Sequence, residues 1–539
     1  MRGLMMDYQL TLPAIMRRAE SLWPDTEIVS RLPDRSLYRY RYRQLFERAR
    51  RLAAALRRLG IVPGDRVGTL AWNHHQHLEA YFAVPSIGAV LHTLNLRLHP
   101  TDLAGIVGDG GDRIVIVDRV LLPLLEQIRS RVDVEHVIVM GGDGPLPDGA
   151  IDYEALLESA DATDGGPIEL DERQAAAMCY TSGTTGRSKG VLYSHRALVL
   201  QCLYWTAADI LGACQRDVML GVVPMFHING WGMPFTAPLV GAKLVLPGSG
   251  LDPDGLLELV HRERVTLSAG VPTVWLGVLQ ALEAGHPADV SSLRTLLVGG
   301  SAVPRALMEG YDRYGVRVVQ GWGMTEVTAI GSMSVLPRDL DDAPADRQYD
   351  ARTRAGIPVP FVEIRARSES GLVPWDGETM GELEVRGATV ASAYYDNADG
   401  TGCFTPDGWF RTGDIVTIDS AGSIRVCDRS KDLIKSGGEW ISSVALENAL
   451  MGHPAVAEAA VVAIRDPKWD ERPLACVVVK AGHTVTSDEL RAFLAPDFAK
   501  WWLPDAYEFV DHIPRTSTGK FLKSALRERF QTSRLVERS

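Results

Sequence analysis

The chain has 539 residues, of which 46% are hydrophobic and 23% charged, and its formal net charge is −12. This length predicts more than one domain, and the composition is that of a globular protein with a sizeable core. The acidic balance, interrupted only by short basic clusters, argues against a nucleic-acid partner, although local loops can still bind a small anionic ligand.

The cysteines and the apolar runs bear on location and covalent chemistry. Six cysteines lie far apart and form no C-x-x-C pair, so we expect reduced, buried thiols rather than a disulfide framework or a zinc site. The N-terminus lacks the apolar run of a secretory signal, and no apolar stretch reaches the roughly 18 residues of a membrane span. These features predict a cytoplasmic protein without a transmembrane segment.

The first part of the chain alternates between two kinds of segment. Residues 66–71, 114–117 and 136–140 are short, apolar and β-branched, which is typical of buried strands. Residues 79–88 and 121–131 have helical spacing. This alternation predicts an α/β fold with buried sheets.

Three histidines, His74, His75 and His77, precede the first of these helical segments. On a helix, His74 and His77 would share a face, which is one arrangement that binds a metal ion. Only Glu79 lies nearby to extend the set of ligands. A metal site is therefore disfavoured here, and the role of the three side chains stays open.

The densest signal is a loop of glycines, hydroxyls and one lysine at residues 180–190, between two strand-like runs. Glycines let backbone N–H groups approach an anion, hydroxyls can donate to phosphate oxygens, and Lys189 adds a positive charge. The loop is not a Walker A motif, because Lys189 follows Gly186 by three residues and no helix opens after it. A flexible surface turn is the alternative, but turns seldom have this composition.

Two further segments suggest a ligand site less strongly. Residues 224–231 are apolar and contain one histidine, His227, and then Trp231; a lone histidine in such surroundings is usually a core residue. Gly299, Gly300 and Ser301 follow the strand-like run 295–298. A strand end with paired glycines is where α/β sheets place ligands.

Residues 320–326 combine an aromatic face, two glycines, a hydroxyl and a carboxylate directly after another strand-like run. These groups suit a purine, a phosphate and a hard cation. The alternative is a strand-to-loop turn around a core tryptophan, but packing alone explains neither the glycines nor Glu326. The segment contains Gln320, Gly321, Trp322, Gly323, Met324, Thr325 and Glu326.

A different pattern begins near residue 381. Residues 382–386, 414–418 and 423–426 alternate in polarity with glycine-containing turns between them, which predicts antiparallel strands and a small β-barrel. Asp414 lies in this region, and Arg429 follows it.

The last part of the chain indicates a separate unit. Residues 445–450 have the pattern of a helix, and residues 456–464 and 474–480 that of strands. It also holds a glycine-containing loop, residues 435–440, and a polar loop with Lys520. The predicted division is an N-terminal domain of residues 1–428, a hinge at 429–431 and a C-terminal domain of residues 432–539.

In their order and residues, these motifs resemble those of the adenylate-forming enzymes, which include acyl-CoA synthetases, beetle luciferases and peptide-synthetase adenylation domains. The chain is most similar to bacterial fatty-acyl-CoA synthetases, over nearly its whole length. Two positions depart from the pattern: Ser188 stands where the family usually has proline, and Trp322 where it more often has tyrosine.

The resemblance implies an α/β fold, with a large N-terminal domain of two α/β sheet subdomains plus a small β-barrel, and a small mobile α+β C-terminal domain. It implies that ATP and a carboxylic acid form an acyl adenylate and pyrophosphate, and that coenzyme A then takes the acyl group. Mg²⁺ would be a cofactor, and the protein would be a homodimer. A medium- to long-chain fatty acid is the expected substrate, with aryl acids and short sulfur-containing acids as alternatives.

The resemblance also assigns roles to individual residues. Lys520, Lys435, His227, Glu439 and Thr181 would be catalytic, and Lys431 would be the hinge residue. Glu326 and Thr181 would hold the metal ion. His227, Trp231, Gly299 and Gly323 would line the acyl site, with Trp231 as its gate. Lys435, Gly437, Gly438, Glu439 and Trp440 would bind CoA. The ATP site would comprise Thr181, Ser182, Gly183, Thr184, Thr185, Gly186, Lys189, Gly299, Gly300, Ser301, Gln320, Gly321, Trp322, Gly323, Met324, Thr325, Asp414, Arg429 and Lys520.

Three other functions share these motifs in part. An adenylating ligase that loads the pantetheine arm of a carrier protein is the nearest alternative, and a luciferase-like oxygenase has the same nucleotide motifs. A non-catalytic nucleotide- or acyl-binding regulator belongs to a different class. The presence of Glu326, Lys435 and Lys520 argues against the last, because binding alone would not need both lysines.

Overall fold

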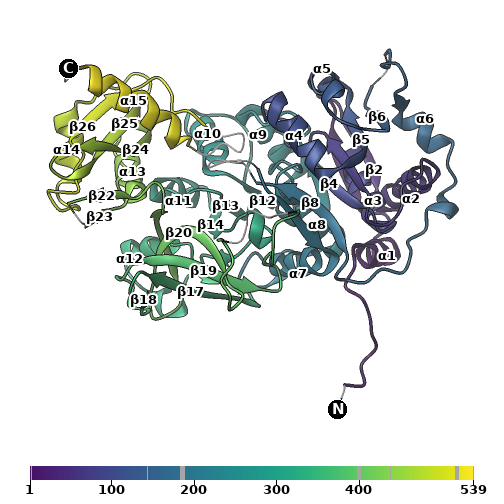
Figure 1. Cartoon of the computed structure of the whole chain (residues 1–539), viewed down its shortest axis with the longest axis horizontal. Coiled ribbons are helices and arrows are strands. Elements are labelled where there is room, and N and C mark those ends of the chain that lie inside the picture. The colour runs from purple at the N-terminus through teal and green to yellow at the C-terminus, as the bar shows by residue number, and fades with distance from the viewer. Residues whose placement is uncertain are drawn as a thin grey trace.

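The computed structural model of the chain describes residues 1, 3–142, 144–181, 188–396, 402–437, 439–515 and 521–537, with side chains as far as Phe530. Within these residues the strands form four sheets (Figure 1). Three of them belong to the long N-terminal part of the chain, and the fourth lies with the C-terminus at one end of the molecule (Figure 1). No helix in the described ranges is long and apolar enough to cross a membrane.

The first sheet has the strand order β16-β15-β14-β13-β12-β10-β11-β1-β2. Its middle strands are parallel, while β2, β15 and β16 pair antiparallel. Its strands are β1 (Glu27–Arg31), β2 (Leu37–Arg41), β10 (Val218–Leu220), β11 (Lys243–Leu246), β12 (Leu267–Gly270), β13 (Thr295–Gly299), β14 (Arg317–Trp322), β15 (Ser332–Met333) and β16 (Ile357–Pro358).

The second sheet has the order β7-β6-β5-β3-β4-β8-β9 and is parallel except for β9. Its strands are β3 (Arg66–Leu70), β4 (Val90–Thr93), β5 (Asp112–Asp118), β6 (His136–Met140), β7 (Ile151–Asp152), β8 (Ala175–Tyr180) and β9 (Gly190–Ser194). The predicted strands at 66–71, 114–117 and 136–140 are confirmed as β3, β5 and β6.

Helices cover the faces of these sheets. Side chains on the central strand β13 alternate: Leu296 and Val298 pack in one core cluster with α9, α10 and α11, whereas Leu297 packs in the cluster shared with the second sheet. This burial on both faces explains the continuous apolar runs. The helices are α1 (Leu12–Leu22), α2 (Tyr42–Arg58), α3 (His75–Ser86), α4 (Pro100–Gly110), α5 (Leu122–Glu126), α6 (Tyr153–Glu158), α7 (His195–Thr206), α8 (Met233–Val240), α9 (Pro253–Glu263), α10 (Pro272–Glu283), α11 (Arg305–Asp312) and α12 (Ala345–Arg352).

The prediction of one continuous helix at residues 121–131 is wrong. Residues 121–131 are divided among the 3₁₀ turn η1 (Arg119–Leu121), the short helix α5 and the 3₁₀ turn η2 (Arg129–Arg131). The other short 3₁₀ turns are η3 (Ala162–Gly165), η4 (Ile228–Gly232), η5 (Thr325–Val327) and η6 (Arg338–Leu340).

The third sheet is antiparallel, in the order β18-β17-β19-β20-β21. The antiparallel strands predicted from residue 381 onward are confirmed here. In the described part of the chain β18 and β21 stand at opposite edges, so the predicted barrel is an open sheet. Its strands are β17 (Val362–Ser368), β18 (Gly371–Leu372), β19 (Gly381–Gly387), β20 (Phe410–Ile418) and β21 (Ile424–Arg429).

The fourth sheet and its helices form the unit that we call the C-terminal domain (Figure 1). The sheet order is β23-β22-β25-β24, with β26 parallel to β25. Two core clusters lie on its two faces. Its elements are β22 (Ile434–Ser436), β23 (Glu439–Ile441), α13 (Ser443–Met451), β24 (Val456–Asp466), β25 (Asp470–Val479), α14 (Ser487–Leu494), β26 (Ala506–Phe509) and α15 (Lys523–Glu537).

The three neighbouring histidines are built into the core at the start of α3. The His74 ring lies 2.5 Å from Asp118, and His75 lies 3.3 Å from the Ser30 hydroxyl. The fully buried His77 contacts the Trp72 carbonyl and the Thr69 hydroxyl, each at 3.0 Å. Each ring therefore has its own structural partner.

Burial of His77 predicts a loss of stability in acid. Burial lowers the pKa of His77 from 6.5 to about 4. Below pH 6.5 the His77 side chain is protonated in the unfolded chain, whereas in the folded chain it becomes protonated only near pH 4. The contribution of this group to the free energy of unfolding is therefore largest above pH 6.5 and falls as the pH decreases. This group should cost about 3 kcal/mol of unfolding free energy between pH 7 and pH 4.

The His77→Gln variant should be less stable than the wild type at pH 7, because the glutamine replaces two ring contacts. Its further loss of stability between pH 7 and pH 4 should be smaller than that of the wild type by about 3 kcal/mol. Urea unfolding of both proteins at each pH measures the difference. Parallel pH profiles would contradict the assignment.

Candidate active site

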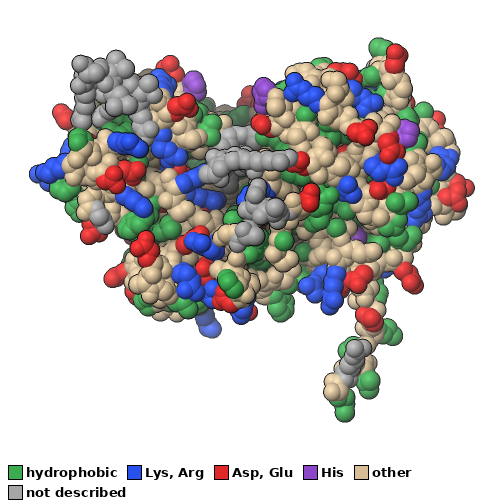
Figure 2. Space-filling model, in the orientation of Figure 1, with side chains coloured by type: hydrophobic (Ala, Val, Ile, Leu, Met, Phe, Trp, Pro, Cys, Tyr) green, Lys and Arg blue, Asp and Glu red, His purple; other side chains and the backbone are tan. Residues whose placement is uncertain are grey.

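A cleft of about 1550 Å³ lies between the first and third sheets on one side and the C-terminal domain on the other. In Figure 2 the upper outline of the molecule is indented between the C-terminal domain and the long N-terminal part of the chain. The carboxyl ends of β13 and β14 and the loops after them contribute Gly300, Ser301, Gln320, Gly321, Trp322 and Gly323 to its lining. The third sheet contributes Asp414 and Arg429, and the C-terminal domain contributes Arg515, Phe521 and Lys523.

A hydrogen-bonded cluster forms one wall of this cleft. The Trp322 indole N–H donates to one oxygen of Asp414 at 2.8 Å, and the Arg429 Nε lies 2.7 Å from the other. Asp414 is 2% exposed, so its charge is held in a low-dielectric setting by these two partners. The structure thus brings together three residues that the motifs separate by up to 107 positions.

Glycines permit the close backbone contacts at the strand ends. A side chain at Gly299 would meet the Gly321 carbonyl at 2.6 Å, because β13 and β14 pair at these two residues. A side chain at Gly323 would overlap the Ala329 carbonyl at 1.7 Å. Gln320 supports the adjoining loop by accepting a hydrogen bond from the Val303 N–H at 3.2 Å.

Glu326 lies just beyond this wall, in the turn η5 that follows Gly323 and Met324. The Tyr394 hydroxyl donates to Glu326 at 2.6 Å, and the Lys189 ammonium lies 4.7 Å from the centre of the Tyr394 ring. Burial, together with the neighbouring Glu326, raises the pKa of Tyr394 well above its usual range, so the phenol stays protonated and remains a donor. Thr325 lies beside Glu326, and its carbonyl accepts from the Tyr193 hydroxyl.

The base of the glycine-rich loop is closed by two hydrogen bonds. The Thr181 N–H donates to the Lys189 carbonyl at 2.9 Å, and the Lys189 N–H donates to the Thr181 hydroxyl at 3.1 Å. Through Lys189 and Tyr394, this loop base approaches Glu326. Other predicted residues lie outside the described residues, namely Ser182, Gly183, Thr184, Thr185, Gly186, Gly438 and Lys520.

The predicted acyl-site residues lie in an unusual turn. Ile228, Asn229, Gly230, Trp231 and Gly232 all have positive φ, between 46° and 81°, which costs about 1–2 kcal/mol for each residue with a side chain. The surroundings hold the turn, because the Trp205 indole N–H donates to the Trp231 carbonyl at 3.0 Å. The Trp231 ring is buried, and a Cβ atom added at Gly299 would lie 3.6 Å from it. His227, which precedes the turn, is half-buried.

Lys435, Gly437, Glu439 and Trp440, the described residues of the predicted CoA loop, lie away from the cleft in this structure. Lys435 and Trp440 face each other across the hairpin of β22 and β23, with the ammonium 4.8 Å from the indole, and neither residue lines the cleft. The Gly437 N–H donates to the Trp469 carbonyl at 2.8 Å. Glu439 is exposed in the same hairpin.

Sequence reasoning missed Tyr394, Tyr193 and Trp205. Tyr394 is 68 positions from Glu326, and Tyr193 is 132 positions from Thr325. The signal available for Tyr394 was weak: two tyrosines near the end of a loop-rich stretch. Only the fold brings these side chains to their partners.

Comparisons with known proteins cover nearly the whole chain. The family model described as AMP-binding enzyme matches residues 16–395, and the model described as AMP-binding enzyme C-terminal domain matches residues 445–520. A long-chain-fatty-acid–CoA ligase of Thermus thermophilus is 50% identical over 98% of this chain and 97% of its own length. A medium-chain-fatty-acid–CoA ligase of Ectopseudomonas oleovorans is 41% identical, with 98% of each chain covered.

Solved structures also resemble the whole chain. The structure of an anthranilate CoA ligase in complex with anthranoyl-AMP superposes with a TM-score of 0.88, 27% identity and coverage of 98% of this chain and 99% of that one. The ATP-bound structure of MatB from Rhodopseudomonas palustris has a TM-score of 0.83 and 26% identity, covering 97% and 99% of the two chains.

Proposed function

The chain belongs to the AMP-binding enzyme family, and from this premise we propose that it is an ATP-dependent fatty acid–CoA ligase. Such an AMP-forming acid–CoA ligase converts a carboxylate and ATP into an acyl adenylate and pyrophosphate, and then converts the adenylate and CoA into acyl-CoA and AMP. The observation that supports the proposal most directly is the cleft. The cluster of Trp322, Asp414 and Arg429 lines one side of it, and the C-terminal domain lines the other with Arg515, Phe521 and Lys523.

The first half-reaction is an electrostatic problem. A carboxylate must attack the α-phosphorus of ATP although both are anionic, and pyrophosphate must leave from the opposite side. Lys189, Arg429 and Lys520 are the cations proposed to offset this charge, so that catalysis consists mainly of positioning and charge stabilisation. Trp322 and Asp414 are the residues proposed to hold adenine and the ribose hydroxyls.

A magnesium ion fits the residues beside the phosphate loop. Glu326 would supply one carboxylate and Thr181 one hydroxyl, a ligand set typical of Mg²⁺ sites in which substrate phosphates and water complete the coordination. The ion would neutralise phosphate charge during adenylation. Glu326 is 6% exposed, and the hydrogen bond from the Tyr394 hydroxyl helps to orient its carboxylate.

The second half-reaction needs the CoA thiol beside the adenylate carbonyl. Lys435, Gly437, Gly438, Glu439 and Trp440 are proposed to form the CoA path, although the described ones lie away from the cleft. A rotation of residues 432–539 against residues 1–428, about Lys431, would exchange the two faces of the C-terminal domain. The chain leaves the third sheet at Arg429 and enters the fourth at Ile434, which supports this hinge.

The buried indole of Trp231 is proposed to gate an acyl site that also involves His227. The Trp231→Ala variant should relax the chain-length preference and change the ratio of kcat/KM between octanoate and palmitate by about tenfold. Initial rates of AMP release with acids of graded length measure this ratio. An unchanged profile would remove Trp231 from that role.

Two further proposals come from the family resemblance: that the protein is cytoplasmic and that it forms a homodimer. Sedimentation equilibrium of the purified protein tests the second. A monomer at all concentrations up to those of the assay would contradict it.

The proposed function is tested with purified protein, Mg²⁺, ATP and CoA across straight-chain acids, with aryl acids and 3-methylmercaptopropionate as competitors. A curated relative named 3-methylmercaptopropionyl-CoA ligase, from Ruegeria lacuscaerulensis, is 40% identical over 98% of this chain, which justifies the last competitor. We expect acyl-CoA, AMP and pyrophosphate in equal amounts. Failure to exchange labelled pyrophosphate into ATP with any acid would overturn the proposal.

A further inference from the structure

A chain of buried polar groups crosses the place where the polypeptide passes from the third sheet to the C-terminal domain. Asp428, near the end of β21, is 1% exposed. One of its oxygens accepts two hydrogen bonds from Ser443, from the N–H at 2.7 Å and from the hydroxyl at 2.6 Å. The neighbouring Ser442 hydroxyl donates to the Cys427 carbonyl. The start of α13 is therefore attached to the last strand of the third sheet.

The same cluster continues into the last helix. The Lys523 ammonium, at the start of α15, donates to the Ser443 hydroxyl at 2.6 Å and lies 2.7 Å from Glu447 on α13. Glu447 also accepts from the Val461 N–H at 2.7 Å. Asp428, Ser443, Lys523 and Glu447 thus form one connected network, with donors matched to acceptors at each step.

Burial makes this network sensitive to the loss of any member. Burial raises the pKa of Glu447 to about 7 and also raises that of Asp428, whereas Glu447 and Asp428 outweigh the effect of burial on Lys523 and raise its pKa. Removing one partner leaves another polar group buried without its charge or hydrogen bond, which costs more than the pair contributes. The four residues should therefore act together.

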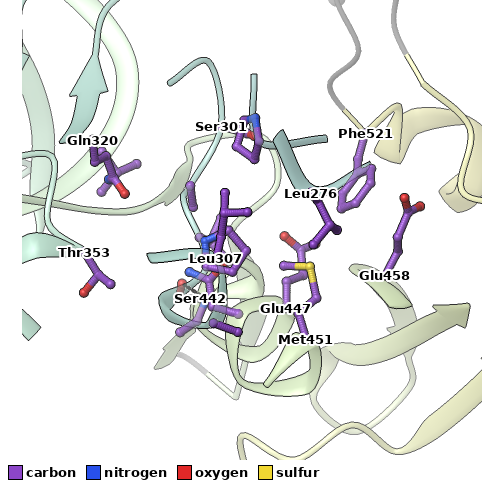
Figure 3. Close-up of a pocket in the computed structure, with 18 of the residues that line it drawn as sticks. Leu276, Ser301, Leu307, Gln320, Thr353, Ser442, Glu447, Met451, Glu458 and Phe521 are labelled. Carbon is purple, nitrogen blue, oxygen red and sulfur yellow. Dashed lines mark hydrogen bonds between the residues drawn. The ribbon is translucent and has the colours of Figure 1, made fainter. Parts of the chain in front are cut away.

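The network links two parts of the molecule that the proposed rotation must separate. Asp428 precedes the linker, whereas Ser443, Glu447 and Lys523 follow it. In the present arrangement, Ser442, Glu447 and Phe521 line the cleft together with Leu276 and Leu307 (Figure 3), while Lys435 and Trp440 do not. Any large rotation about the linker would carry Ser443 away from Asp428.

We propose that Asp428, Ser443, Glu447 and Lys523 form an interdomain latch that holds the C-terminal domain in the arrangement for adenylation and must open before thioester formation. This inference rests on the proposed function, because it assigns the observed arrangement to the first half-reaction. Lys523 and Ser443 are positioning residues, since they act through the placement of the whole domain.

The latch is tested by measuring the two half-reactions separately in the full-length enzyme. Pyrophosphate exchange reports adenylation, and acyl-CoA formation from supplied acyl adenylate reports the second step. The Ser443→Ala variant removes the hydroxyl between Asp428 and Lys523, and Lys523→Met removes the charge. Each should raise the ratio of the second rate to the first by about fivefold or more, because the latched arrangement becomes less populated.

A matched control comes from the same domain. Thr486 is exposed at the start of α14 and caps this helix through its hydroxyl, so Thr486→Ala removes a structural hydroxyl without touching the latch. It should leave the ratio unchanged. The charge-preserving variant Lys523→Arg should restore much of the wild-type ratio.

The outcomes separate the latch from the function on which it rests. If the wild type performs neither half-reaction, the proposed function fails. If the wild type performs both, and Ser443→Ala changes both rates equally or matches Thr486→Ala, the latch is wrong. Should Lys523→Met not fold, Ser443→Ala alone decides the question.

Discussion

Replacing Lys520 with alanine should lower the rate of pyrophosphate exchange by about 10²–10³-fold, the cost expected when a group that stabilises developing charge is removed. Thioester formation from supplied acyl adenylate should remain close to the wild-type rate. The reason is that Lys520 is proposed to reach the α-phosphate only in the arrangement for adenylation, and the rotation that brings the CoA path to the adenylate carries this lysine away. Separate assays of the two half-reactions measure the contrast.

The matched control for this variant is Lys500→Ala. Lys500 is an exposed lysine of the same domain, so its removal changes the domain's charge by the same amount without altering the proposed active site. Both rates should be unaffected. If Lys520→Ala instead slowed both half-reactions equally, the idea that the C-terminal domain presents different faces in turn would be refuted.

Local patterns were sufficient to predict several of the buried strands of this fold. The runs at 114–117 and 136–140 are apolar because β5 and β6 are buried in a mainly parallel sheet. Strands buried on both faces consist of consecutive apolar residues, so they can be predicted from the sequence alone. The predicted helix at 121–131 failed for the opposite reason: the segment contains apolar residues at helical spacing but is divided into three short pieces around α5.

Contacts between distant positions could not be predicted in this way. The sequence pointed to Glu326 through its own neighbours, but nothing in that segment indicates that Tyr394 donates to it. Similarly, Lys523 has the appearance of an ordinary helix lysine, and only the tertiary structure, in which α15 packs against β24, reveals its contacts with Glu447 and Ser443. Such pairings depend on tertiary structure, which sequence periodicity does not encode.

The backbone of η4 is a second feature beyond the reach of sequence patterns. Asn229, Gly230 and Gly232 are compatible with positive φ, but Ile228 and Trp231 are not residues for which it would be expected. Surrounding contacts impose the conformation, including the hydrogen bond from Trp205. Strain of this kind is tolerated where the neighbouring structure determines it, often at functional sites.

The Glu326→Gln variant should reduce pyrophosphate exchange by about 10²-fold and raise the Mg²⁺ concentration needed for half-maximal rate. Glutamine has nearly the same shape and can still accept a hydrogen bond from Tyr394, so the change isolates the negative charge. Rates measured over a series of Mg²⁺ concentrations at saturating ATP test both parts of the prediction.

Tyr394→Phe provides the comparison, because it removes the hydroxyl that donates to Glu326 while retaining the carboxylate and the aromatic ring beside Lys189. Loss of one hydrogen bond should cost about tenfold or less, with a small change in the Mg²⁺ requirement. If the two variants had the same rate and the same Mg²⁺ dependence, the carboxylate would act only as the partner of Tyr394. A metal role for Glu326 requires that removing its charge affect the Mg²⁺ dependence far more than removing the hydroxyl does.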